Sequence, residues 1–235
     1  DIADVEEILL KQVQYNSRIS EEGLSGDYGA NIGSTMLKVY GTDIRNRAIA
    51  KAAAGADARM SGCELPVIIN SGSGNQGITV SIPVIEYAKE LGVPEEKLYR
   101  ALIISNLTAI HEKTGIGTLS AYCGAVSAGC AAGCGIAYLY GGKYEELAHT
   151  LVNSVAIVSG IICDGAKPSC AAKIASSVEA GILGYHMYMN GQEFKYGEGI
   201  VNNGVEKTIY NIGRLGKDGM KQTDKEIVKI MLNQC

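Results

Sequence analysis

Cysteine is the residue type in this sequence with the clearest capacity for chemistry. Cys163 and Cys170 bracket the segment CDGAKPSC, whose aspartate, glycine and proline predict a loop between helices. Cys123, Cys130 and Cys134 are spaced by seven and four residues, which predicts that they share one face of a helix. Thiolates gathered from a helix and a loop suit an iron–sulfur cluster or a zinc ion. The CxxC pairs typical of zinc ribbons are absent, which disfavours zinc.

The neighbours of each cysteine separate a chemical role from core packing. Cys130 and Cys134 lie among alanine and glycine, and a free cysteine behaves as a small hydrophobic residue, so packing is favoured for both. Cys163 and Cys170 share a loop with an aspartate and a lysine, which fills a core poorly and favours a metal or catalytic role. The seven cysteines cannot all pair within the chain, so we expect a reduced, cytoplasmic protein.

A glycine-rich stretch, residues 72–77, matches the pattern G-x-G-x-x-G after the apolar run LPVIIN. A dinucleotide-binding unit needs a second strand with an acidic residue, but a helix opened by Pro94 follows here, so nicotinamide or flavin binding is disfavoured. Backbone N–H groups and the start of a helix instead predict a cradle for a carboxylate or phosphate, with a tight structural turn as the alternative. The cradle would be formed by Ser71, Gly72, Ser73, Gly74, Asn75 and Gln76.

Histidine supplies three further candidates for proton transfer. His111 lies at a predicted helix end, followed by Glu112 and Lys113, just before the turn TGIG. His149 and His186 lie within predicted helices, where a lone histidine is more often structural than catalytic. His111 is therefore the preferred acid–base candidate.

Helical periodicity dominates the chain and supplies the expected framework. Apolar spacing predicts a first helix over residues 2–13, and Thr42 is expected to cap an alanine-rich helix. One helix should end at Gly92, and the next should run from Pro94 to about His111. The run LPVII is the only candidate strand. Further helices are expected in the small-residue segment and in YEELAHTLVNSVAIVSGII, PSCAAKIASSVEAGILGYHMYM and DKEIVKIML. The prediction is an all-α fold, a single compact domain over 1–235 with glycine-rich connecting loops.

The composition argues against several classes of protein. A net charge of −4 without a basic stripe argues against nucleic acids and anionic membrane surfaces as partners. With 46% apolar and 20% charged residues, the chain is not disordered. No charge occurs between Lys113 and Lys143, a stretch long enough to cross a bilayer. This stretch is mostly Gly, Ala, Ser and Cys, which favours a buried helix over a membrane span.

Three of these segments together resemble a known family. SGSGNQG, TGIGTLSAYCGAVSAGCAAG and IICDGAKPSCAAKIA, in this order, resemble the α domain of iron–sulfur-dependent L-serine dehydratases and, more closely, the L-cysteine desulfidases and their bacterial relatives. The resemblance extends from about Ile44 to the end of the chain. It implies an all-helical fold and a four-iron, four-sulfur cluster held by Cys123, Cys163 and Cys170. Cys130 and Cys134 are then left to packing.

The resemblance also implies an activity, β-elimination on a small L-amino acid. The expected reaction converts L-cysteine to pyruvate, ammonia and sulfide. L-Serine dehydration and a non-catalytic metal-binding subunit are the alternatives. The loop at residues 71–77 would hold the substrate carboxylate, Lys113 and Lys167 would compensate charge near the cluster, and His111 is a possible general base.

Members of the desulfidase type are longer and carry an N-terminal region with a cysteine proposed as a base. No segment here resembles that region, so this chain is expected to be the C-terminal portion of a longer protein. The missing region or a partner chain would complete the site, and a homo-oligomer is possible. Cys63 is either close to the site or merely buried. Cys235 is either an idle terminal thiol or a plug for the open iron.

Overall fold

The computed structural model describes residues 2–233, and within them it contains ten α-helices and no β-sheet, which confirms the all-α prediction. A 3-10 helix, η1 (Ile2–Asp4), precedes the first of these helices, and a π-helical segment, η2 (Leu215–Gly219), precedes the last. The α-helices are α1 (Glu6–Ser25), α2 (Ile32–Tyr40), α3 (Ile44–Met60), α4 (Gly74–Leu91), α5 (Glu95–Ile116), α6 (Gly124–Leu139), α7 (Tyr144–Val158), α8 (Ser169–Met189), α9 (Val205–Arg214) and α10 (Lys221–Met231).

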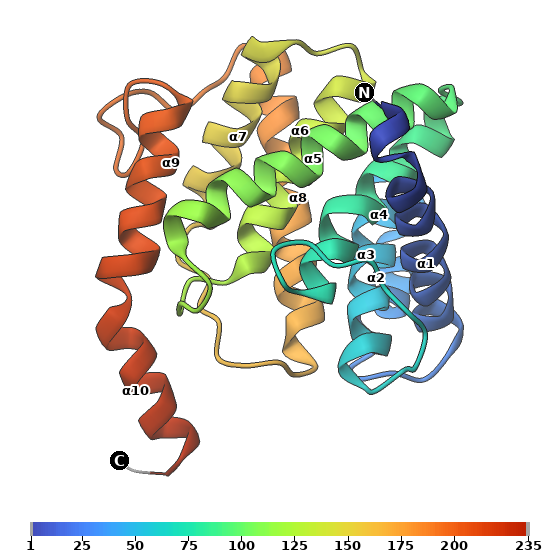
Figure 1. Cartoon of the computed structure of the whole chain (residues 1–235), viewed down its shortest axis with the longest axis horizontal. Helices are drawn as coiled ribbons and strands as arrows, with labels where there is room; N and C mark the ends of the chain where they lie inside the picture. The colour runs from blue at the N-terminus through green and yellow to red at the C-terminus, as the bar shows by residue number, and fades with distance from the viewer. Residues whose placement is uncertain (1, 234–235) are drawn as a thin grey trace.

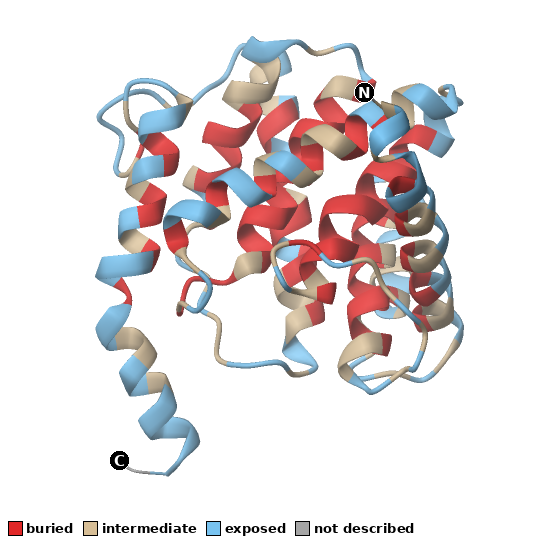
Figure 2. Ribbon diagram, in the orientation of Figure 1, coloured by how far each residue is buried: buried red, intermediate tan, exposed pale blue. Residues whose placement is uncertain are grey.

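Helix α6 lies at the centre of the molecule, where it packs against α4, α5, α7 and α8 (Figure 1). The burial view shows the same interior as the densest buried region, whereas α10 projects from the body and buries none of its residues (Figure 2). The described part of the chain includes no helix long and apolar enough to cross a bilayer. Within the uncharged stretch after Lys113, residues 124–139 form α6, and most of them are buried.

Glycine allows the backbones of α6 and α8 to approach closely. A Cβ atom built on Gly133 would lie 2.5 Å from the carbonyl oxygen of Gly181. A Cβ atom built on Gly129 would lie 2.4 Å from the carbonyl carbon of Ser177. Since real Cβ atoms do not approach this closely, only glycine fits at these positions, and the small-residue composition of α6 is a packing requirement.

The helix boundaries follow the sequence signals in part. Gly92 ends α4 with a φ of 60°, as predicted. Helix α5 continues past His111 to Ile116 and stops before Gly117. The predicted cap at Thr42 is wrong, because α3 begins one residue later and the side chain of Asp43 accepts a 3.0 Å hydrogen bond from the Asn46 amide.

The predicted strand LPVII is also wrong, since residues 65–69 run irregularly across the surface of α1 and α4. The backbone groups of Ile68 find their partners in one side chain of α1. The Ile68 amide donates to Oδ1 of Asn16 (2.9 Å), and Nδ2 of Asn16 donates to the Ile68 carbonyl (3.2 Å). Asn16 is fully buried, so a single amide side chain satisfies the segment in place of a neighbouring strand.

Candidate functional site

Two segments far apart in sequence bring Cys123 and Cys163 together. The Cys163 amide donates to the Ala121 carbonyl (2.6 Å), and the Cys123 amide donates to the Ile161 carbonyl (3.1 Å). These bonds frame an isolated antiparallel bridge between Tyr122 and Ile162. Cys123 precedes α6 instead of lying on it, so the prediction that it shares a helical face with Cys130 and Cys134 is wrong.

The bridge is supported from two further directions. The hydroxyl of Ser120 donates to the Gly216 carbonyl in η2 (2.6 Å) and accepts from the Tyr122 amide (3.0 Å). The buried ring of Tyr122 reaches Ser159 at the end of α7, with 3.1 Å between the two hydroxyl oxygens. The Cys123 backbone is therefore fixed by contacts to α7, η2 and the cysteine loop.

The two thiols interact strongly, and their acidities diverge as a result. Hydrogen bonding from Cys123 stabilises the Cys163 thiolate and lowers the pKa of Cys163 to about 5. The same interaction, with burial, raises the pKa of Cys123 well above its ordinary value. Lys167 and Lys173 contribute smaller lowering effects at Cys163. The pair therefore holds one thiolate readily at neutral pH, which is the form that binds metals or attacks electrophiles.

Cys170 lies on the same loop, in the first turn of α8. Its thiol points back into the loop, with 3.6 Å between its Sγ and the Gly165 carbonyl oxygen. Asp164 anchors this loop through ion pairs with both Lys167 and Lys173, and these hydrogen bonds lower the pKa of Asp164 to about 2. Lys167, singled out as a catalytic candidate, is thus an anchor of the loop that carries two cysteines.

Lys173 is a member of this site that the sequence interpretation missed. Its ammonium donates to the Ile162 carbonyl (2.8 Å). Burial lowers the pKa of Lys173, but the hydrogen bond and charge of Asp164, with smaller effects of Cys123 and Cys170, raise this pKa overall. Its position one helical turn after Cys170 was the available signal, because residues three apart on a helix share a face.

His111 and Lys113 diverge although they are two residues apart. Lys113 is half-buried near Cys163 and Cys123, and burial lowers its pKa against the opposing effect of both thiols. His111 instead pairs with Glu206 on α9 at 2.8 Å, where both side chains are exposed. Two residues correspond to about 200° of helical rotation, so the two side chains point to different faces of α5.

The glycine-rich segment forms a tight turn that leads into α4. Asn70 and Ser73 exchange two backbone hydrogen bonds of 3.1 and 3.0 Å. Ser71 and Gly72 between them have φ angles of 48° and 80°, in the left-handed region. The Ser73 side chain caps α4 by accepting from the Gln76 amide (3.4 Å). Helix α4 thus begins at Gly74, inside the glycine-rich segment that is predicted to precede it, and the function of this segment as a cradle stays a prediction.

The loop and the cysteine segment meet at Gln76. A Cβ atom built on Gly124 would lie 2.4 Å from the amide nitrogen of Gln76, so this side chain covers the residue that follows Cys123. Gln76 is only 8% exposed, and its side-chain oxygen has no hydrogen-bond partner. A buried acceptor without a partner is costly, and a donor group brought to this oxygen would remove that cost.

Arg59, at the end of α3, is a second residue that the sequence interpretation passed over. Its guanidinium donates to the side-chain oxygen of Asn75 (3.3 Å) and lies across Gly74, whose Cβ position would be 2.3 Å from Nε. Its setting as an arginine near the end of an alanine-rich helix gave no signal of this contact, which arises only from the tertiary fold.

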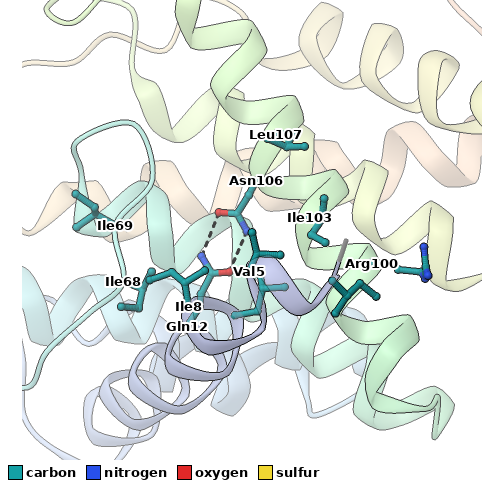
Figure 3. Close-up of a pocket in the computed structure, with 11 residues that line it drawn as sticks. Val5, Ile8, Gln12, Ile68, Ile69, Arg100, Ile103, Asn106 and Leu107 are labelled. Carbon is teal, nitrogen blue, oxygen red and sulfur yellow. Dashed lines mark hydrogen bonds between the residues drawn. The ribbon is translucent and has the colours of Figure 1, made fainter.

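A separate apolar pocket of about 480 Å³ lies between α1, α5 and residues 68–69 (Figure 3). Gln12 and Asn106 exchange side-chain hydrogen bonds of 3.1 and 2.9 Å at its polar edge. Asn70 donates to both the carbonyl and the side-chain oxygen of Asn106 (3.2 and 3.0 Å). This amide chain connects the pocket to the turn at Ser71 and helps to fix that turn.

The remaining cysteines occupy other surroundings. Cys130 and Cys134 are buried in the core, and the Cys134 thiol donates to the Leu147 carbonyl (3.4 Å), in keeping with the packing interpretation. Cys63 is half-buried beside Tyr28. The possible plug, Cys235, lies outside the described residues.

The three thiols of Cys123, Cys163 and Cys170 are ligands of the chemical type that an iron–sulfur cluster needs. Cys123 and Cys163 are already adjacent, Cys170 lies on the same loop, and nearby lysines favour thiolates. In the described range, no three His, Cys, Asp or Glu side chains are arranged to hold a metal ion. The Cys170 thiol contacts the Gly165 carbonyl in this arrangement. The dinucleotide interpretation loses its basis, because the described residues contain no β-sheet.

Comparison with known proteins gives a consistent assignment. The family model described as serine dehydratase alpha chain matches residues 1–229. A UPF0597 protein of Desulfitobacterium hafniense is 68% identical over 234 residues, which is 100% of this chain and 54% of that relative. UPF0597 proteins of Lachnoclostridium phytofermentans and Treponema denticola are 60% and 50% identical, over 99% and 98% of this chain and 56% and 55% of their own lengths.

The chain therefore spans about half the length of the curated relatives it matches. No solved structure matches it. The match to the family model over nearly every residue, together with the close relatives, shows that this chain belongs to the serine dehydratase alpha chain family.

Proposed function

We propose that this chain is the cluster-binding portion of an iron–sulfur-dependent lyase that carries out β-elimination on a small L-amino acid. The observation that supports it most directly is the contact between Gln76 and Gly124, which joins the glycine-rich loop to the paired thiols of Cys123 and Cys163. A candidate substrate-binding element and a candidate metal-binding element thus meet at one place. The rest of the full-length protein, or a partner chain, completes the active site.

In this proposal Cys123, Cys163 and Cys170 hold a four-iron, four-sulfur cluster. When bound, the cluster supplies a Lewis-acidic iron that stabilises negative charge on the substrate. Lys113 and Lys173 place positive charge beside the thiols, and Lys167 holds the loop through Asp164. These cations offset the negative charge that three thiolates would bring together.

The elimination itself needs a proton acceptor at the substrate Cα. Loss of the Cα proton leaves an electron pair that forms the Cα–Cβ double bond, and the Cβ–sulfur bond breaks as hydrosulfide departs with the bonding electron pair. The aminoacrylate then tautomerises and is hydrolysed to pyruvate and ammonia. His111 pairs with Glu206 on another face of α5, so we assign the general base to the part of the protein outside this chain.

L-Cysteine is the proposed substrate. L-Serine is the second candidate, favoured by the description of the matching family as serine dehydratase. Both reactions release pyruvate and ammonia, but only the first releases sulfide. Steady-state assays of pyruvate and sulfide from each amino acid, on the full-length protein purified without oxygen, decide between them.

The test of the site is iron and acid-labile sulfide content after anaerobic reconstitution. We expect about four iron and four sulfide ions per chain, with a visible spectrum that the substrate alters. Replacing Cys123, Cys163 or Cys170 by serine should abolish the cluster, whereas Cys63→Ser, a half-buried thiol elsewhere, is the matched control and should retain it. A full-length protein that binds no iron contradicts the proposal. A cluster-containing protein without turnover on either amino acid favours the non-catalytic alternative.

A further inference from the structure

Arg59 is a half-buried cation whose charge is not balanced by a carboxylate. Across the described residues, no Asp or Glu side chain forms an ion pair with it, and its one side-chain hydrogen bond goes to the neutral amide of Asn75 (3.3 Å). Three other arginines, Arg45, Arg47 and Arg100, are paired with carboxylates, and Arg18 and Arg214 are exposed. Arg47 pairs with both Glu86 and Glu90, and Arg100 pairs with Glu96.

The surroundings of Arg59 restrain it. Its guanidinium lies across Gly74, where a Cβ atom would be only 2.3 Å from Nε, so the absence of a side chain at residue 74 makes room for it. The hydrogen bond to Asn75 orients the same group at the first turn of α4. By helix geometry, the amides of that turn lack intrahelical partners and point outward as donors. The Ser73 hydroxyl accepts from the Gln76 amide, which leaves the Gly74 and Asn75 amides of this turn without a hydrogen-bond partner among the described residues. A planar cation held at such a turn suits a carboxylate.

A second observation concerns the same turn of α4. The side-chain oxygen of Gln76 is buried and has no partner, although the residue is only 8% exposed. An α-amino acid in its zwitterionic form carries an acceptor for a guanidinium and a donor for an amide oxygen. The Arg59 guanidinium and the side-chain oxygen of Gln76 are complementary in charge to those two groups.

We propose that Arg59 is the residue that binds the α-carboxylate of the amino-acid substrate. This inference rests on the proposed function, and it adds to it a specific requirement, namely a free α-carboxylate on the substrate. Arginine suits this task because its planar fork matches both carboxylate oxygens, whereas lysine offers a single point charge.

The experiment compares the Arg59→Gln variant with the wild type, both as the full-length protein. Each is tested with L-cysteine and L-serine and with L-cysteinamide and L-serinamide, which lack the carboxylate. Binding is measured by calorimetry, and KM and kcat are measured where turnover occurs. We expect Arg59→Gln to weaken binding of the free amino acids by about 10- to 100-fold, with kcat changed far less. Binding of the amides should be weak in both proteins and nearly equal.

Arg59→Lys and Arg100→Gln complete the design. Arg59→Lys keeps the charge and should give an intermediate affinity, and it preserves the test if the glutamine variant folds poorly. Arg100→Gln removes an exposed arginine that is paired with Glu96, and it should leave affinity unchanged. Equal affinity of wild type and Arg59→Gln for L-cysteine and L-serine overturns the inference. An equal loss for the free amino acids and the amides also overturns it, because that pattern indicates a structural role.

The two proposals fail in different ways. A protein that binds the free amino acids through Arg59 but never releases pyruvate contradicts the lyase function and keeps the carboxylate site. A protein that turns over substrate with the same KM after Arg59→Gln keeps the lyase function and contradicts this assignment. A protein that binds neither amino acid contradicts the carboxylate site directly.

Discussion

Two regions of this molecule use the same side chain for opposite purposes. Inside α6, Cys130 and Cys134 are buried among alanine and glycine, and burial raises the pKa of both thiols far above the ordinary value. At the junction of two loops, Cys163 faces Cys123 near Lys173, and its pKa falls to about 5. The difference lies in the surrounding backbone and charges, since a helix interior offers neither a free hydrogen-bond donor nor a cation. The reactivity of a cysteine is therefore set by the element that carries it.

The largest loss of stability is expected from a substitution between α6 and α8, where the two backbones approach closely. Gly133→Val places side-chain atoms against the Gly181 carbonyl, which a Cβ alone would approach to 2.5 Å. We expect a loss of unfolding free energy of about 3 kcal/mol or more, or failure to fold. Ser176→Val, at an exposed position of α8, is the control and should change stability by less than about 0.5 kcal/mol. Urea titration measures both, and equal midpoints would refute the contact.

Exchanging sulfur for oxygen tests the two regions directly. Cys130→Ser puts a hydroxyl into a site with no exposure, and we expect it to lower the unfolding free energy by about 1–3 kcal/mol. Cys170→Ser, on the loop, should cost less than about 0.5 kcal/mol in the metal-free protein. Thermal or urea unfolding of the two variants side by side decides the matter, and a reversed order would contradict the assignment of Cys130 to the core.

Thiol alkylation separates the regions by acidity. Because the pKa of Cys163 is lowered to about 5, its thiolate persists as pH falls from 8 to about 6 and is lost only as pH falls through 5. Alkylation of metal-free protein with iodoacetamide, read by peptide mass spectrometry, should modify Cys163 at a nearly constant rate over that window, while Cys130 stays unmodified.

Cys123→Ala sharpens the alkylation experiment, since hydrogen bonding from Cys123 is the largest cause of the lowered pKa. In this variant the alkylation rate of Cys163 should fall by about tenfold for each pH unit below its raised pKa. A rate at Cys163 that still does not depend on pH would show that the lysines, and not Cys123, set its acidity.

The smallest effect concerns the ion pairs that anchor the cysteine loop. The pKa of Asp164 is lowered to about 2, so its contribution to stability is present above about pH 4 and is lost as pH falls from 4 to 2. Asp164→Asn should therefore lower stability at pH 7 by less than about 1 kcal/mol, because the pair is partly exposed. Stability curves of the two proteins should converge at low pH, and a constant offset would exclude the ion pairs as its cause.

Much of the fold could be predicted from the sequence because helical signals are local. The stop at Gly92 and the helix over the small-residue segment need only neighbouring residues to be recognised. The strand prediction for LPVII failed because the backbone of Ile68 is bonded by the side chain of Asn16 and not by a neighbouring strand. Asn16 is distant in sequence, so no local pattern indicates this contact. Helices α2 and α9 are short, and the sequence interpretation missed them.

At the candidate site, too, the contacts between residues distant in sequence could not be predicted. The loop between Cys163 and Cys170 could be recognised from its composition, and its pairing with Cys123 came only from the family resemblance. The convergence of Gln76 on Gly124, and of Arg59 on Gly74, depends on how α3, α4 and α6 pack. Spacing along the chain carries no record of those contacts, so Arg59 could not be weighed before the fold was known, whereas the position of Lys173 one turn after Cys170 was a signal that the sequence interpretation missed.

The glycine contacts between α6 and α8 also bear on conformational entropy. Burying glycine or alanine costs almost no rotamer freedom, whereas each buried leucine or isoleucine costs about 0.5–1 kcal/mol. The interior of α6 is built mainly from alanine, glycine, serine and cysteine, so few of its side chains can change rotamer. Fluctuations of this helix must then move whole backbone segments against α8. Because Cys123 caps the start of α6, the cysteine junction is attached to a helix whose side chains have little rotamer freedom.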